Sequence, residues 1–182
     1  MTSTMHSTHF PPLGEPHQRE EVGHQLQATL VELVDLSLLG KQLHWNVVGP
    51  LFRPLHLQLD ELIDSWRELA DTVAERAVAI GFSPDGQSTT IASDAPLRAV
   101  NRGEIEDRVV VRELTGRLAE VAERASERMD RLGELDAATQ DVLIEVVRAL
   151  EKQLWMIRVQ FQNGGTTHVA DQQRFSGRRV SR

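Results

Sequence analysis

The amino-acid sequence predicts an all-α protein, a four-helix bundle with a long crossover between its second and third helices. Four long segments carry apolar residues every three or four positions, which is the spacing of a helix with one buried face. Residues 81–103, between the second and third segments, are rich in turn-forming residues. A bundle built from two helical hairpins needs one long crossover at this point. The 182 residues, 40% of them hydrophobic, suffice for one domain with a sizeable core.

The first helix is expected at residues 18–48, where Glu20 and Glu21 complement the positive end of the helix dipole. Its apolar residues occupy more than one face, with Leu26, Leu30 and Leu33 on one stripe and Leu36, Leu38 and Leu39 beside it. A helix in a single bundle needs only one buried face. The additional apolar positions therefore favour an interface with another subunit.

The second helix is expected at residues 54–81 and has a simpler pattern, because one stripe contains most of its large apolar residues. The stripe comprises Leu55, Leu59, Leu62, Trp66, Leu69, Val73, Ala77 and Ile80. Pro54 is compatible with the first turn of a helix, since a proline there leaves no additional backbone donor unpaired. This stripe is expected to form the centre of the bundle.

The third helix is expected at residues 104–132 and the fourth at 137–162, with Gly133 ending the third and Asp136 capping the fourth. The third helix alternates charges along one side, through Arg117, Glu120, Glu123, Arg124, Glu127 and Arg128. Such alternation is typical of a face exposed to solvent. We therefore expect these six side chains to point outward.

Candidate metal ligands are concentrated in the segment 41–75. His56 and Asp60 are four positions apart, as are Asp71 and Glu75, so each pair lies on one face of a helix. His44 lies about one turn before the Gly49-Pro50 break and is level with His56 if the two helices form an antiparallel hairpin. Imidazole and carboxylate together are a suitable ligand set for a first-row metal such as iron.

The two carboxylate-containing pairs cannot reach one metal ion within a single chain. Asp60 and Asp71 are separated by eleven positions, so they share a face but lie roughly 16 Å apart along the helix. If the helix packs antiparallel against its symmetry mate, residues 56 and 60 of one copy meet residues 71 and 75 of the other, with the dyad near Ser65 and Trp66. Each dimer then contains two shared sites. A single pair of polar residues four positions apart on a helix is ordinarily exposed to solvent. Five residues that satisfy one geometry instead point to a metal centre.

The pattern Lys41-x-x-His44-Trp45-Asn46, then His56-x3-Asp60, then Asp71-x3-Glu75, resembles the Dps family (DNA-binding protein from starved cells). The resemblance covers roughly residues 20 to 163. It implies a ferritin-like bundle assembled into a hollow homododecamer that oxidises Fe(II) with hydrogen peroxide or O₂ at dinuclear iron sites between subunits and stores the ferric mineral. It also implies a short helix near residues 95–100. Trp45, next to a ligand, is expected to lie close to the metals.

The resemblance further implies a threefold pore for iron entry at the start of the fourth helix. Four carboxylates cluster there: Glu134, Asp136, Asp141 and Glu145. Rings of carboxylates attract cations and raise their local concentration. The alternative is that Asp136 caps the helix and the others complement its dipole.

The two ends of the chain are expected to be an arm at residues 1–17 and a tail at residues 164–182. The arm contains His6 and His9, which could collect metal, although a flexible polar arm is the simpler interpretation. The tail contains four arginines, Arg174, Arg178, Arg179 and Arg182, against one aspartate, a net charge of +3. Repeated around a cage, such a tail could bind DNA weakly, or it could simply be solvated.

Overall composition excludes several classes of function. A formal net charge of −7 argues against a generally basic DNA-binding surface. The absence of cysteine excludes disulfides and thiolate metal sites. Neither a signal-peptide pattern nor an apolar run long enough to span a bilayer is present, so a cytoplasmic protein, in which association with the nucleoid is possible, is expected. The competing function is a shell that compacts DNA and binds metal only incidentally.

Overall fold

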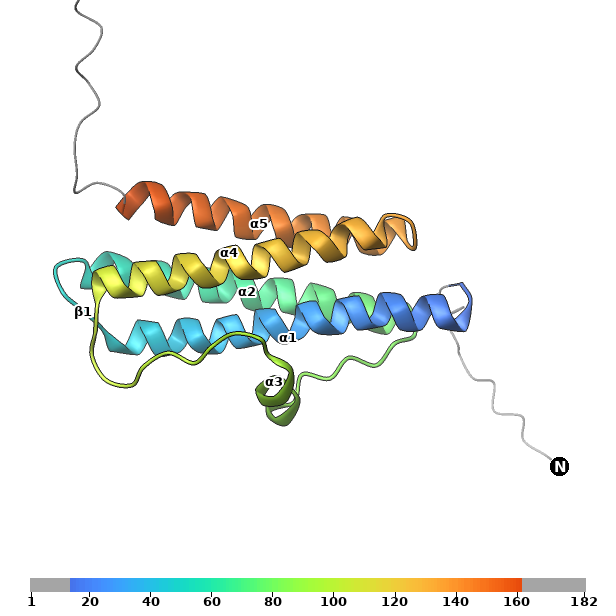
Figure 1. The fold of residues 1–182 in the computed structure, drawn as a ribbon, viewed down its shortest axis with the longest axis horizontal. Coiled ribbons are helices and arrows are strands. Elements are labelled where there is room, and N and C mark those ends of the chain that lie inside the picture. The colour runs from blue at the N-terminus through green and yellow to red at the C-terminus, as the bar shows by residue number, and fades with distance from the viewer. Residues whose placement is uncertain (1–13, 162–182) are drawn as a thin grey trace, which may run out of the picture.

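The structure is a computed structural model that describes residues 14–161, and within this range it is an all-α bundle of four long helices (Figure 1). The elements in order are α1 (Pro16–Asn46), β1 (Val47–Val48), α2 (Phe52–Ala79), α3 (Ser88–Asp94), β2 (Ile105–Glu106), α4 (Asp107–Leu132) and α5 (Ala137–Phe161). Helices α1 and α2 form one hairpin and α4 and α5 form the other, joined by the crossover that contains α3 (Figure 1). The predicted fold class and the predicted crossover are confirmed.

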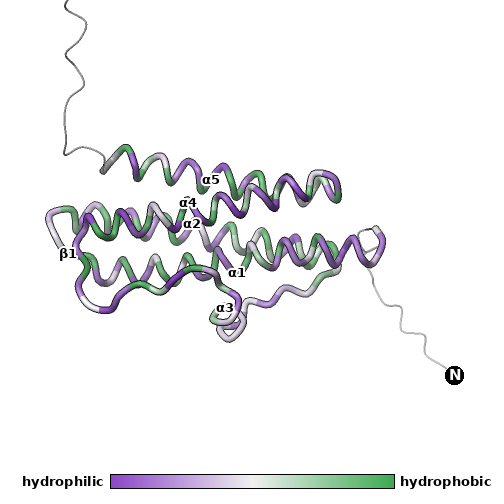
Figure 2. The backbone as a smooth tube through the Cα atoms, viewed as in Figure 1, coloured by the Kyte–Doolittle hydropathy of each residue, from purple (hydrophilic) through white to green (hydrophobic). Residues whose placement is uncertain are grey.

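The core lies between the two hairpins and contains buried apolar residues of all four long helices. Hydrophobic and hydrophilic residues alternate along each of these helices (Figure 2). All eight residues of the stripe predicted for α2 are buried. Trp66, at the centre of α2, is fully buried and donates its indole N–H to the side-chain oxygen of Gln153 on α5, at 2.8 Å. Gly40 permits close approach of α1, because a Cβ there would lie 2.7 Å from the Trp66 ring. A tightly packed α1–α2 pair therefore provides the frame for the candidate metal site.

The short helix of the crossover is not where it was predicted. Residues 95–100 are not helical, and the helix is α3, at Ser88–Asp94. Pro96 disfavours helical geometry at the residue before it. Asp85 instead favours a start at Ser88, because its carboxylate accepts hydrogen bonds from the Gln87 backbone N–H at 2.9 Å and the Thr90 hydroxyl at 2.8 Å.

Two short strands replace helix ends that were predicted. Val47 and Val48 pair in parallel with Ile105 and Glu106, respectively, so α1 ends at Asn46 and α4 begins at Asp107. Valine and isoleucine fit an extended strand better than a helix end, because branching at Cβ restricts their side chains in a helix. The pairing attaches the α1–α2 turn to the end of the crossover.

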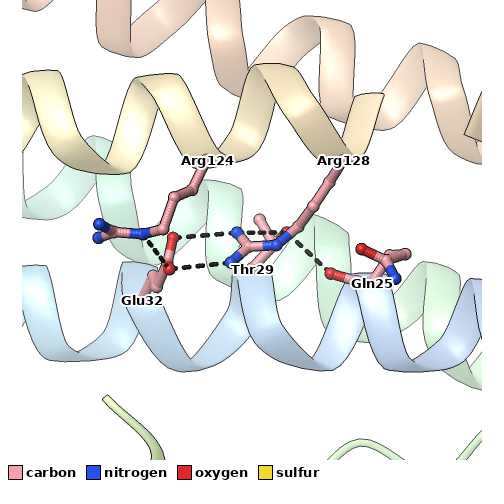
Figure 3. Close-up of polar contacts among 5 residues, drawn as sticks. All are labelled: Gln25, Thr29, Glu32, Arg124 and Arg128. Atoms are coloured by element: carbon pink, nitrogen blue, oxygen red, sulfur yellow. Dashed lines mark hydrogen bonds and ion pairs between the residues drawn. The ribbon is translucent and has the colours of Figure 1, made fainter. Parts of the chain in front are cut away.

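The prediction that the charged side of α4 faces solvent is wrong for three arginines. Arg117 is buried, and Arg124 and Arg128 reach across to Glu32 on α1, whose side chain is only 2% exposed (Figure 3). Arg124 donates its Nε–H to Glu32 at 2.6 Å, and Arg128 donates two N–H groups to both carboxylate oxygens, at 2.9 and 3.0 Å. The partner lies more than ninety residues away in sequence, so the pattern of α4 alone could not reveal it.

Candidate metal centre

The α1–α2 turn brings two predicted ligands, His44 and His56, into contact. Their rings are stacked, with centroids 3.7 Å apart and planes inclined by 21°. His44 Nδ1 lies 2.9 Å from the backbone oxygen of His56, and His56 Nδ1 lies 3.1 Å from the backbone oxygen of His44. Because a carbonyl oxygen only accepts, each Nδ1 carries the hydrogen and each Nε2 keeps its lone pair. This tautomer is the one that binds a metal through Nε2.

Asp60 completes a three-residue cluster with the two histidines. One potential ligand atom from each of His44, His56 and Asp60 lies within 4.8 Å of the others, and no other group of this kind occurs in the part of the chain that the structure describes. His44 is buried, whereas the Asp60 side chain is 41% exposed. The cluster therefore opens toward the surface on its carboxylate side.

Lys41 provides a positive charge beside Asp60. Its ammonium group forms a short ion pair with Asp60 Oδ1, and the His44 ring nitrogen lies 3.4 Å from the same oxygen. The hydrogen bond from Lys41 is the main reason that the pKa of Asp60 lies below its ordinary value, and the charge of Lys41 lowers it further. Asp60 is thus held as a carboxylate that is paired with the Lys41 ammonium group.

Asp71 and Glu75 are not joined to this cluster within the chain. Both lie on the same helix as Asp60, in its second half, and both are exposed. This is the arrangement that the eleven-residue separation predicts. One chain therefore holds a cluster of three ligands and, farther along α2, an exposed pair of carboxylates.

Several large apolar side chains on α1 and α2 are exposed, and one of them, Phe52, lies beside the cluster. Trp45 is 70% exposed and Phe52 is 44% exposed, with the Phe52 ring centroid 5.0 Å from that of His56. Leu57, one residue after His56, and Leu38, on α1, are also exposed. Large apolar residues that are exposed in a single chain are often covered by a partner at an interface. They favour a partner that covers the open side of the cluster.

The four predicted pore carboxylates do not share one environment. Glu134, Asp141 and Glu145 are exposed, whereas the Asp136 side chain is only 10% exposed and forms an ion pair with Arg76 at 2.6 Å. Asp136 also accepts the Thr139 backbone N–H at 3.2 Å, as the predicted helix cap should. Burial alone would raise its pKa, but hydrogen bonds from Thr139 and Arg76 outweigh that effect and hold it below the ordinary value. Asp136 therefore has a structural role within one chain.

The predicted arm and tail lie largely or wholly outside the described residues. The histidines of the arm at positions 6 and 9 are among the residues not described, as are Arg174, Arg178, Arg179 and Arg182 of the tail. Within residues 14–161, no helix is long and apolar enough to cross a membrane.

Comparisons with known proteins show which family the chain is similar to. A family model described as a ferritin-like domain matches residues 23–165. DNA protection during starvation protein 2 of Deinococcus radiodurans is 34% identical over 160 residues, which make up 88% of this chain and 66% of that protein. The DNA protection during starvation protein of Mycolicibacterium smegmatis is 33% identical over 147 residues, 80% of this chain and 79% of that protein.

A solved structure gives the same result at the level of the fold. The structure of Mycobacterium smegmatis Dps is 31% identical in sequence, with a TM-score of 0.80, and the match covers 93% of this chain and 97% of that chain. The family model matches the bundle from residue 23, within α1, to the end of α5, and the two relatives are identical to this chain at about a third of the aligned positions. The chain belongs to the Dps family of ferritin-like proteins.

Proposed function

We propose that the protein is a ferroxidase that stores iron and thereby protects DNA from oxidative damage. In this proposal, chains assemble into a hollow dodecamer in which antiparallel α2 helices of neighbouring copies form dinuclear iron sites. Each site takes His44, His56 and Asp60 from one subunit and Asp71 and Glu75 from the other. The observation that carries the proposal is the three-residue cluster, which is open on its carboxylate side and has the exposed Phe52 ring beside His56.

The ligand set suits the oxidation of Fe(II). Neutral imidazoles donate lone pairs, while three carboxylates supply negative charge that stabilises Fe(III) over Fe(II). Each Fe(II) loses one electron, and hydrogen peroxide takes up two electrons and two protons to give water, so a pair of irons matches one peroxide. Binding of the first iron displaces the Lys41 ammonium group from Asp60, since both positive charges compete for the same oxygen.

Removal of ferrous iron and peroxide together explains how such a protein would protect DNA without binding it tightly. Both reactants are consumed at the site, and the ferric product is stored inside the shell. The relatives named for DNA protection during starvation support this part of the proposal. The competing function, a DNA-compacting shell with incidental metal, is supported only by the basic tail.

One preparation of the assembled protein tests the proposal against its competitor. Fe(II) is added without oxygen, peroxide follows, and the oxidised iron and the consumed peroxide are both measured. We expect oxidation far faster than in buffer alone and two electrons transferred per peroxide. A gel-shift assay with duplex DNA is run on the same sample. Oxidation at the buffer rate, together with tight DNA binding, would favour the compacting shell.

Asp141→Asn is expected to slow iron uptake mainly at low ferrous concentration. If Asp141 lines an entry pore, losing its charge lowers the local cation concentration, an effect that excess Fe(II) overcomes. The rate of uptake is measured over a range of Fe(II) concentrations, with Asp130→Asn, an exposed aspartate on α4, as the control. Equal slowing at every concentration would indicate damage to the oxidation site instead.

Deletion of residues 171–182 is expected to abolish DNA binding and leave iron oxidation unchanged. The chain as a whole carries a charge of −7, so contact with DNA requires a local basic segment, and this deletion removes all four tail arginines. Binding by the intact protein should be weak, independent of sequence and lost as salt is added. Gel shifts at several salt concentrations measure it. A truncated protein that still shifts DNA at moderate salt would contradict the assignment to the tail.

A further inference from the structure

The turn between α1 and α2 is attached to the start of α4 at two successive points. The first is the parallel pairing of β1 with β2, which joins Val47 to Ile105 and Val48 to Glu106. The second is Asp107, the residue directly after β2, which contacts the turn just beyond β1. His44 precedes this attached segment by three residues and His56 follows it by five. The spacing between the two histidines therefore depends on how the segment is held.

Asp107 makes the second attachment through a buried carboxylate. The residue is 6% exposed, and its Oδ2 accepts the backbone N–H of Leu51 at 2.8 Å, across 56 positions of sequence. Leu51 is the N-cap residue of α2, the helix that contains His56 and Asp60. A partly buried N–H that loses its acceptor costs free energy, so this hydrogen bond favours the start of α2 at this position.

Gly49 makes room for this carboxylate. Its φ is +122°, a conformation that residues with a Cβ rarely adopt, and a Cβ built there would lie 2.5 Å from Asp107 Oδ2. Glycine is therefore required twice, for the backbone angle and for the approach of Asp107. The close fit shows that the turn and the carboxylate constrain each other.

We propose that Asp107 is a positioning residue of the metal centre, which sets the spacing of the His44 and His56 rings by holding the turn between them. This inference rests on the proposed function, since it assumes that the two imidazoles bind metal. The reciprocal contacts of each Nδ1 with the other histidine's backbone oxygen, at 2.9 and 3.1 Å, require one relative position of α1 and α2. Asp107 touches neither ring and acts through the backbone of Leu51.

Binding of Co(II) to the iron-free assembled protein tests this role without any oxidation. Co(II) is titrated into the protein in the absence of oxygen, and the visible absorption of the coordinated Co(II) is recorded at each addition. The titration gives both an affinity and a spectrum. Asp107→Ala removes the acceptor, and we expect Co(II) affinity to fall by about 10- to 100-fold, as for other residues that orient metal ligands. Asp107→Asn keeps an oxygen at the same distance and should restore affinity to within about threefold of wild type.

Two further variants make the result decisive. Serine is compatible with the start of a helix, but its hydroxyl is too short to reach the position of Asp107 Oδ2. Asp107→Ser should therefore weaken Co(II) binding, and it provides the test if Asp107→Ala does not assemble. Arg108→Ala changes the exposed residue that follows Asp107 and should leave Co(II) binding unchanged. If the wild type binds Co(II) and every assembled Asp107 variant matches its affinity and spectrum, Asp107 has no positioning role. If the wild type itself binds no Co(II), the metal centre of the proposed function fails.

Discussion

Asp60→Ala and Glu75→Ala subunits, each inactive on its own, are expected to regain rapid Fe(II) oxidation when dissociated and reassembled together. Each variant alone should lose about 100-fold or more in rate, because even residues that only orient ligands account for 10- to 100-fold. In a mixed dimer, one of the two shared sites receives Asp60 and Glu75 from the intact halves of the two chains. Random pairing at equal amounts then restores about one quarter of the sites.

The matched control for this experiment uses two variants from the same half of the site. Asp60→Ala mixed with His56→Ala leaves one ligand missing at every site, because both residues come from the same subunit in the proposed geometry. This mixture should stay inactive after the same treatment. Initial rates of oxidation by peroxide compare the two mixtures. Recovery in both, or in neither, would contradict a site shared in this way between copies of α2.

Glu32→Gln is expected to lower the free energy of unfolding by about 3 kcal/mol, the lower end of the range for breaking a buried ion pair. The Glu32 side chain is 2% exposed and balances two guanidinium groups, of which Arg128 is 12% exposed and Arg124 is 29% exposed (Figure 3). Removing the carboxylate charge leaves both arginines without their counter-ion. Their partial exposure lets water compensate in part, which places the loss at the lower end of the range.

Chemical denaturation at a fixed protein concentration measures this effect, because assembly makes stability depend on concentration. Glu123→Gln, an exposed residue of α4, is the control and should change stability by no more than about 0.5 kcal/mol. The triple variant in which Glu32, Arg124 and Arg128 all become Met should recover most of the loss, since apolar replacements for a whole buried ion cluster are often neutral. A loss below about 1 kcal/mol for Glu32→Gln would show that the cluster is effectively solvated.

The spacing of residues along the sequence was sufficient to predict the bundle and the candidate ligands. Apolar residues at helical intervals predicted the buried stripe of α2, from Leu55 to Ile80, and all of it is buried. The positions of His44, His56 and Asp60 predicted that one chain would bring these three together. The same spacing predicted that Asp71 and Glu75 would remain apart from them. These features depend on helix geometry, which repeats every 3.6 residues wherever the helix forms.

Contacts between distant segments could be found only in the tertiary structure. The pattern of α4 made Arg124 and Arg128 resemble solvent-facing residues, because their partner Glu32 lies on α1. The β1–β2 pairing and the hydrogen bond from Leu51 to Asp107 likewise join segments more than fifty residues apart. Local periodicity determines which residues share a helix face. Which two faces then meet depends on how the whole chain packs, and that packing attached the α1–α2 turn to β2 and to Asp107 at the start of α4.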